Sequence, residues 1–321
     1  MNQEFIRARS RVVQLVRRFF DERGFLEMHT PRLVGLPGQE PYLEPMWSEV
    51  SEADGTKHRG ALITSPEYAM KRMLAAGFEK IYDLGPCFRN GEPWDGTHDP
   101  EFLMIEWYEK GIGLSELMDR TEAMVKWVAV QYGNPFSETA FRRLSVRDAM
   151  KQYADIDLDS LIGDREAMAA ACHEHHQTVN EADTWDDLFF KIFLSEVEPK
   201  LGEVPTFLHT YPASMAALAK KDPSDPRYAL RTELYIGNLE LANGFVELTD
   251  AMEQRKRFEE EQELRRSLGK DVWPIDERFL EALPKMGETS GIAFGVDRLA
   301  MLLTGAKSIS ELMPIPVRER F

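Results

Sequence analysis

The chain has 321 residues, with 39 Lys and Arg against 55 Asp and Glu, and therefore a formal net charge of −16 at pH 7. Hydrophobic residues make up 43% and charged residues 29%, which is ordinary for a globular protein and excludes a disordered or low-complexity chain. The acidic balance argues against a protein that coats nucleic acid or anionic membrane non-specifically. The two cysteines, Cys87 and Cys172, cannot form a disulfide framework, and no stretch approaches the roughly 18 apolar residues of a membrane span. We therefore expect a cytoplasmic enzyme.

The first part of the chain predicts one long helix followed by short elements. Apolar residues at near-helical spacing predict an amphipathic helix over residues 3–23, ended by Gly24. Short strands are expected over 25–30 and 61–64, with a loop rich in Pro and Gly between them. The Ser-Pro-Glu sequence at 65–67 then predicts a helix with the serine as N-cap and the proline as first helical residue.

The remaining elements do not alternate regularly between strand and helix. A hairpin is expected from strands at 81–89 and 101–108, around a polar loop. Periodicity then predicts helices at about 114–132, 145–153, 165–175 and 185–197, a strand at 204–211, two strands within 231–250, a helix at 251–268, and a strand at 290–296 with a helix after it. Asn243-Gly244 is a strong signal for the turn between the two strands. This order favours an α+β fold with a mainly antiparallel sheet flanked by helices, and we expect residues 1–321 to form a single domain.

The hairpin holds the first group of residues that can carry chemistry. Arg89 ends its first strand, where a guanidinium can grip an anionic oxygen with two parallel hydrogen bonds. On the return strand, Phe102, Glu106 and Tyr108 have even spacing and point to one face. An aromatic plane near a cation suits a nucleotide. An ordinary hairpin with a core phenylalanine and a salt-bridged arginine is an equally good interpretation of these residues taken alone.

Two later segments add carboxylates and glycines. Glu233, Glu240 and Glu247 are seven residues apart, and a turn at Asn243-Gly244 would let them converge on Mg²⁺ or on a cationic substrate, although a solvated acidic hairpin is the simpler alternative. Gly291 and Gly295 lie four apart in an apolar strand, where another group can approach the backbone closely. Asp297 at the strand–helix junction can cap the helix. Arg298 in the first turn opposes the helix dipole, and either has a ligand or is simply exposed.

Taken in order, these segments resemble the signatures of class II aminoacyl-tRNA synthetases. Residues 18–31 resemble motif 1, residues 88–106 resemble motif 2, and Gly291 to Arg298, with its GxxxGxDR form, resembles motif 3. Residues 64–67, 106–108 and 240–250 are similar to the lysyl-tRNA synthetase branch. Motif 1 begins near residue 18, which leaves no room for an N-terminal anticodon-binding domain. That absence points to the truncated paralogues of this branch, which join (R)-β-lysine to elongation factor P. The sequences of residues 98–102 and 209–214 also resemble those paralogues.

The resemblance implies an ATP-dependent ligase that forms an aminoacyl-adenylate and transfers it to a lysine of elongation factor P. It implies catalytic roles for Arg89 and Arg298. It places ATP on Arg89, Asn90, Glu92, Asp99, Phe102, Glu240, Leu241, Gly295 and Arg298, with Mg²⁺ on Glu240 and Glu233. The amino acid would meet Ser65, Pro66, Glu67, Glu106, Tyr108, Asn243, Glu247 and Ala293. It also implies a homodimer, with no tRNA and no membrane as partner.

Three departures from the family pattern bear on specificity. Gly91 follows Asn90, so that Glu92 comes one place later than in the usual Phe-Arg-Asn-Glu sequence. Asp99 stands where the family usually has Asn, and an acid beside a phosphate needs a cation to screen it. Ala293 replaces a usual Gly, and its added methyl group is consistent with β-lysine over α-lysine.

Two other functions remain open from the sequence. A synthetase fragment could pass its lysyl-adenylate to tRNA or another acceptor, and a non-catalytic class II-like module could bind an amino acid or tRNA and signal. The group formed by Cys172, His173, His175 and His176 could suggest a metal, but a polar helix end is the simpler interpretation because no second ligand cluster follows.

Overall fold

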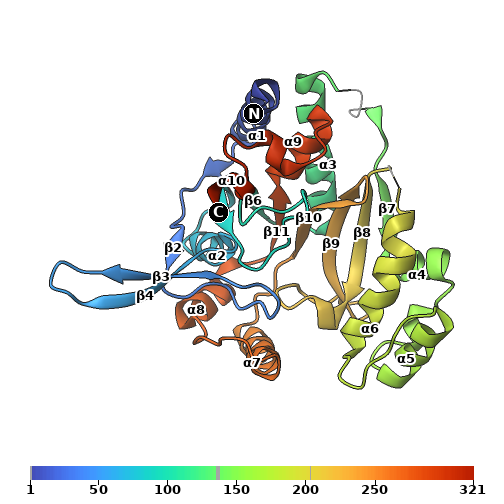
Figure 1. The fold of residues 1–321 in the computed structure, drawn as a ribbon. Coiled ribbons are helices and arrows are strands. Elements are labelled where there is room, and N and C mark those ends of the chain that lie inside the picture. The colour runs from blue at the N-terminus through green and yellow to red at the C-terminus, as the bar shows by residue number, and fades with distance from the viewer. Residues whose placement is uncertain (1, 135–137, 203) are drawn as a thin grey trace. The chain divides into compact units, whose positions relative to one another are not determined.

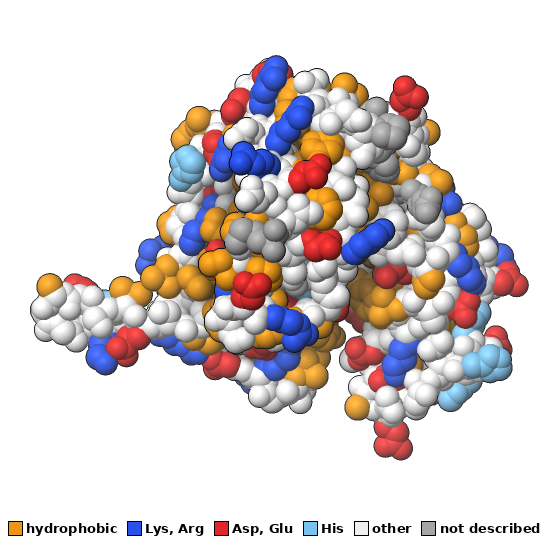
Figure 2. All heavy atoms as spheres, turned by 45° about the horizontal axis from the view of Figure 1, so that its top comes forward, with side chains coloured by type: hydrophobic (Ala, Val, Ile, Leu, Met, Phe, Trp, Pro, Cys, Tyr) orange, Lys and Arg blue, Asp and Glu red, His pale blue; other side chains and the backbone are white. Residues whose placement is uncertain are grey.

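The computed structural model describes residues 2–134, 138–202 and 204–321, and the chain divides into two compact units. Unit 1 comprises Met1–Ser137 and Glu247–Phe321, and unit 2 comprises Glu138–Val246. Within the described residues, no helix is both long enough and apolar enough to cross a membrane. On the face shown in Figure 2, Lys and Arg side chains are interspersed with Asp and Glu side chains.

One group of paired strands in unit 1 has the order β1-β5-β6-β11. They are β1 (Leu26–Glu27), β5 (Lys80–Phe88), β6 (Glu101–Lys110) and β11 (Thr289–Gly295). β1 is parallel to β5, and the other pairs are antiparallel. The predicted hairpin is confirmed as β5 and β6. Its register places Glu106 between Asp83 and Ala293, and Tyr108 opposite Gly291, so these residues share one face of the sheet.

Helices cover the other face of this sheet. The helix predicted over residues 3–23 is confirmed as α1 (Gln3–Asp21), which contacts α3 (Leu114–Tyr132) and α9 (Val296–Thr304) (Figure 1). Phe20 of α1 stacks on Tyr82 and lies 4.9 Å from the ring of Trp107, measured between centroids. Because Tyr82 and Trp107 alternate with Asp83 and Glu106, the helical layer leaves the Glu106 face to other elements.

A three-stranded sheet and two further helices belong to the same unit. β2 (Leu33–Val34), β4 (Lys57–Leu62) and β3 (Met46–Ser51) form the sheet, and β3 and β4 extend as a hairpin (Figure 1). The predicted strand 61–64 overlaps the end of β4 at residues 61 and 62 only, and β3 was not predicted. α2 (Glu67–Ala75) packs on α8 (Glu277–Met286), which contacts α7 (Ala251–Ser267).

The start of α2 differs from the prediction by one residue. Pro66 is the N-cap, and Glu67 is the first helical residue. The hydroxyl of Ser65 accepts from the backbone N–H of Glu67 at 3.3 Å. Ser65 thus contacts the first turn without taking the cap position, because Pro66 already has the non-helical backbone of a cap.

Unit 2 has strands in the order β10-β9-β8-β7 with helices packed against them. The strands are β7 (Arg142–Ser145), β8 (Thr206–Pro212), β9 (Tyr228–Ile236) and β10 (Leu239–Val246), and the helices are α4 (Val146–Ala154), α5 (Arg165–Glu174) and α6 (Trp185–Ile192), which continues as a π-helical segment to Val197. Cys172 lies in the apolar core of this unit and donates to the carbonyl of Leu188. The helices predicted here, and the strand at 204–211, are confirmed with shifted ends.

The turn predicted at Asn243-Gly244 is wrong. Both residues lie inside β10, opposite Glu233 and Thr232 of β9. The chain turns instead at Gly237 and Asn238, whose φ angles are 58° and 64°. A two-residue hairpin turn of this type needs positive φ at both positions, which Gly and Asn tolerate best. The Asn243-Gly244 pair therefore does not bring Glu240 and Glu247 together across a turn.

Candidate active site

A buried cluster of charged residues lies on the face of the unit 1 sheet that carries Glu106, opposite the face covered by α1. We define this carboxylate cluster as Glu67 and Lys71 of α2, Glu106 of β6, and Glu247. The Nζ of Lys71 lies 2.5 Å from Oε1 of Glu67 and 2.7 Å from Oε2 of Glu247. The side chains of Lys71 and Glu247 have no exposed surface. The backbone N–H of Glu247 donates to the carbonyl of Thr289, which fixes Glu247 against β11.

Burial dominates the electrostatics of the carboxylate cluster. It raises the pKa of Glu247 to about 8, a shift that the charge of Lys71 opposes and that of Glu67 reinforces. Burial and the nearby charge of Glu67 also hold the pKa of Glu106 well above its ordinary value. Three carboxyl groups here face one ammonium, so the cluster favours binding of a further cation.

Tyr108 and Gly291 form one wall of the cluster. The Tyr108 hydroxyl donates to Oε2 of Glu106 at 2.9 Å. The ring lies directly against Gly291, where an added Cβ would stand 2.2 Å from Cε1 of Tyr108 and 2.8 Å from Oε1 of Glu247. Oε1 of Glu247 has no hydrogen-bond partner among the described residues. Glycine is thus the only residue type at position 291 that leaves room for the Tyr108 ring and the Glu247 carboxylate where they lie.

Other residues predicted to meet the amino acid lie close by. Ser65 hydrogen-bonds to Glu106, and Pro66 follows it at the start of α2. Ala293 lies opposite Glu106 and packs against Ile63, Cys87 and Met104. Burial raises the pKa of the Cys87 thiol to about 12, which makes it a core residue and not a nucleophile at neutral pH.

Arg89 and Phe102 lie at the other end of the hairpin, where β5 ends and β6 begins. The Arg89 guanidinium carbon lies 5.2 Å from the centroid of the Phe102 ring. Its Nε is buried and has no hydrogen-bond partner within the described chain. A buried donor without a partner is costly, so this nitrogen is suited to an incoming anionic oxygen. The next residue, Asn90, donates its backbone N–H to the carbonyl of Glu44 at 2.8 Å.

Arg298 connects the start of α9 to the loop of the hairpin. Its Nη2 lies 3.1 Å from Nε2 of His98, and Nδ1 of His98 lies 3.1 Å from Oδ1 of Asp95. Glu92 lies 3.9 Å from the same histidine. The motif 2 loop and the motif 3 arginine therefore meet. The N-cap of α9 is Gly295.

Two aspartates have partners that the sequence did not indicate. Asp99 is buried and accepts from Arg320 of α10 (Val317–Arg320), at 2.5 Å from each oxygen. Arg320 is the screening cation that an acid at position 99 needs. Asp297 does not cap α9, because its oxygens accept from Nε of Arg9 at 2.6 Å and from the N–H of Leu103 at 2.8 Å.

In unit 2, the carboxylate of Glu233 is occupied on both oxygens. Arg231 donates to Oε1 at 2.5 Å, and the hydroxyls of Tyr211 and Tyr235 donate to Oε2 at 2.5 and 2.8 Å. Asn243 accepts from Nε of Arg231 at 2.9 Å. A carboxylate held this way does not fit the metal role expected of Glu233, and the described residues contain no group of three or more His, Cys, Asp or Glu placed to hold an ion.

In unit 2, the resemblance places Glu240 and Leu241 at ATP. Both lie in β10, next to this network. Glu240 stands opposite Tyr235, just before a bulge in β10, and Leu241 is buried. Glu240 is close enough to raise the pKa of Tyr235, although burial is the main cause of that shift.

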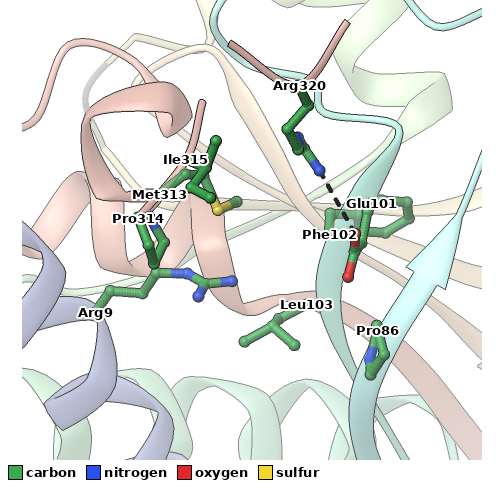
Figure 3. Close-up of a pocket in the computed structure, with 9 residues that line it drawn as sticks. All are labelled: Arg9, Pro86, Glu101, Phe102, Leu103, Met313, Pro314, Ile315 and Arg320. Atoms are coloured by element: carbon green, nitrogen blue, oxygen red, sulfur yellow. Dashed lines mark hydrogen bonds and ion pairs between the residues drawn. The ribbon is translucent and has the colours of Figure 1, made fainter. Parts of the chain in front are cut away.

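A pocket of about 270 Å³, lined in part by Phe102, was not predicted (Figure 3). Its lining includes Arg9, Leu103, Pro314 and Arg320. Leu103 alternates along β6 with Phe102 and Met104, so most of this pocket faces away from the carboxylate cluster. Its arginines are already paired, Arg9 with Asp297 and Arg320 with Asp99.

Two charged pairs within the site region were also missed. Lys71 was not singled out, although its spacing of four from Glu67 on a helix is a recognisable ion-pair signal. Arg32 lies across Gly85 and pairs with the buried Asp83, which is opposite Glu106. No local pattern marks that pair, because the partners are 51 residues apart.

The sheet, the two arginines and the carboxylate cluster define a class II synthetase catalytic fold. Residues 1–319 match the family of class II tRNA synthetases (D, K and N), and the chain belongs to that family. It is 40% identical over 314 residues to the elongation factor P–(R)-β-lysine ligase of Proteus mirabilis, covering 96% of this chain and 94% of the relative. The ligase of the same name from Photorhabdus laumondii is 39% identical over the same shares. A lysine–tRNA ligase of Mycoplasmoides gallisepticum is 36% identical, over 97% of this chain and 64% of that protein.

Proposed function

We propose that this protein activates (R)-β-lysine with ATP and transfers it to a lysine side chain of elongation factor P. The carboxylate cluster is the observation that carries the proposal, because its excess of buried acid calls for a cationic amino acid. The names of the relatives supply the acceptor, and membership of the class II synthetase family implies the use of ATP. The resemblance further suggests a homodimeric cytoplasmic enzyme with no tRNA partner, in which residues 1–321 act as one catalytic domain.

The first step joins the amino acid to ATP. A carboxylate oxygen of the amino acid attacks the α-phosphorus, the bond to the β-phosphate bridging oxygen breaks, and pyrophosphate leaves. Arg89 holds the carboxylate and the α-phosphate, with the partnerless Nε as one donor. Phe102 stacks on adenine, and Asn90 or Glu92 bonds its edge. Arg298 binds at the far end of the nucleotide, near Gly295.

The second step transfers the acyl group. The neutral amine of the acceptor lysine attacks the carbonyl carbon of the adenylate, and AMP leaves as the amide bond forms. Glu67, Glu106, Tyr108 and Glu247 hold the two amines of the substrate, with Ser65, Pro66 and Ala293 completing the pocket. Mg²⁺ bound with ATP would neutralise phosphate charge, and Glu240 is the residue that we assign to hold it. Asp99 acts through Arg320 and shapes the loop, since its own charge is already paired.

The test is ATP–pyrophosphate exchange with α-lysine, (R)-β-lysine and (S)-β-lysine, followed by transfer to elongation factor P or to lysine tRNA. We expect exchange to be strongest with (R)-β-lysine and transfer to occur only to the protein. Arg89→Ala should abolish exchange, while Arg266→Ala, at an exposed position of α7, should leave it unchanged. Absence of exchange with every lysine would overturn the proposal, and transfer to tRNA alone would establish the synthetase alternative instead.

A further inference from the structure

Lys71 is a fully buried lysine that no step described above uses. It extends from α2 between two of the carboxylates that we assign to the amino acid, and its side chain has no exposed surface. We infer that Lys71 is a positioning residue that fixes Glu67 and Glu247 and sets the charge of the amino-acid pocket to that of a diamino acid. This inference rests on the proposed function.

The geometry shows how one lysine can orient two carboxylates. Lys71 approaches Oε1 of Glu67 and Oε2 of Glu247, which leaves Oε1 of Glu247 as the oxygen without a partner in the described chain. Phe279 of α8 lies 5.7 Å from the ammonium and helps to close it off from water. These contacts keep the ammonium away from solvent.

Charge counting shows why the pocket needs this lysine. Glu67, Glu106 and Glu247 would carry −3 when ionised, and Lys71 reduces the sum to −3 + 1 = −2. A lysine-type substrate carries two ammonium groups, which is the matching charge. Without Lys71, three buried carboxyl groups would face one another with no cation between them, and a larger fraction of them would be protonated than in its presence. A protonated carboxyl group is a poor partner for an ammonium, so the substrate would lose affinity.

The same argument predicts a change in pH dependence. The charged or titratable groups that face Glu247 are Lys71 and Glu67 from α2 and Tyr108 from β6. Glu67 disfavours ionisation of Glu247, and Lys71 is the group among them that favours it. Loss of Lys71 therefore moves the ionisation of Glu247 to higher pH, and binding of the amino acid should follow it.

Lys71→Met tests this inference in the full-length enzyme by pyrophosphate exchange. We expect the KM for (R)-β-lysine to rise about tenfold or more at pH 7.5, with the KM for ATP changed less than about twofold. In the unsubstituted enzyme the KM for the amino acid should fall as pH rises and Glu247 ionises. In Lys71→Met this fall should occur at higher pH. Arg72→Met, which removes an exposed cation from the next position of the same helix, should change neither quantity. A pH profile and KM equal to those of the unsubstituted enzyme would overturn the inference.

Two further variants keep the test decisive if Lys71→Met does not fold. In Lys71→Ala, propylammonium should restore exchange, whereas propanol of similar size should not. In a Glu247→Gln background, adding Lys71→Met should raise the amino-acid KM by less than about threefold, because Lys71 acts through the carboxylates. A fully additive loss would overturn the inference. If the unsubstituted enzyme shows no exchange with any lysine, the proposed function fails instead, so the two failures are distinguishable.

Discussion

At the scale of single residues, Gly291 shows how closely the candidate pocket is packed. It separates the backbone of β11 from the Tyr108 ring and from Glu247, which would lie 2.2 and 2.8 Å from an added Cβ. Contacts this short force the neighbours to move, and a well-packed site responds to a single methyl group. The position therefore offers a test of the pocket that leaves every charge in place.

Gly291→Ala should raise the KM for the amino acid by about tenfold or more, since Tyr108 and Glu247 must both shift. It should also lower the free energy of unfolding by about 1–3 kcal/mol through overpacking. Exchange kinetics and chemical denaturation measure the two effects. Gly35→Ala is the matched control, because nothing lies within 4 Å of a Cβ at that position. Unchanged kinetics in Gly291→Ala would mean that this face is not the amino-acid site.

Predictions about single residues were most accurate where they depend only on neighbouring residues in the sequence. The sequence predicted that Glu106 and Tyr108 share a face with Phe102, because strand alternation is a local property. It could not show that Arg320 pairs with Asp99, because the partners are 221 residues apart. The role of Asp297 was misjudged for the same reason, since its partner Arg9 is 288 residues away.

At the scale of elements, the turn preference of a residue pair conflicts with strand pairing in the hairpin of β9 and β10. Asn243-Gly244 has the stronger turn preference, yet it lies in a strand, and the turn falls at Gly237 and Asn238. Turning at residue 243 would have removed Asn243 from Arg231 and broken the ladder beside Glu233. The long helices and the β5–β6 hairpin were predicted correctly because periodicity over many residues outweighs any single pair.

Asn238→Val should lower the free energy of unfolding by about 1–2 kcal/mol, because a β-branched residue is strained at a φ of 64°. Asn238→Gly keeps the positive φ without strain and should be neutral or slightly stabilising. Denaturant titrations of both variants measure the difference. Equal stability of the two would show that the chain does not turn at residue 238.

At the scale of the whole molecule, burial is the cause of the upward pKa shifts among the carboxyl groups. Burial raises the pKa values of Glu106, Glu247 and Glu261, and of Asp186 and Glu198 in unit 2. The Arg227 hydrogen bond lowers that of Asp225 to about 2. A carboxyl group whose pKa is raised by folding binds more protons when folded. It therefore lowers stability as pH rises from its unfolded pKa towards its folded one.

The free energy of unfolding should accordingly be greatest near pH 5–6 and lower by about 2 kcal/mol or more at pH 8.5. The net charge of −16 at pH 7 adds self-repulsion in the same direction. Glu261 carries an oxygen without a partner among the described residues and lies outside the assigned site. Glu261→Gln should therefore reduce the dependence of the free energy of unfolding on pH. Glu263→Gln, at an exposed position of the same helix, should not. Denaturation at pH 5.5, 7.0 and 8.5 measures the slope, and a stability that rises towards pH 8.5 would contradict this account of the buried carboxyl groups.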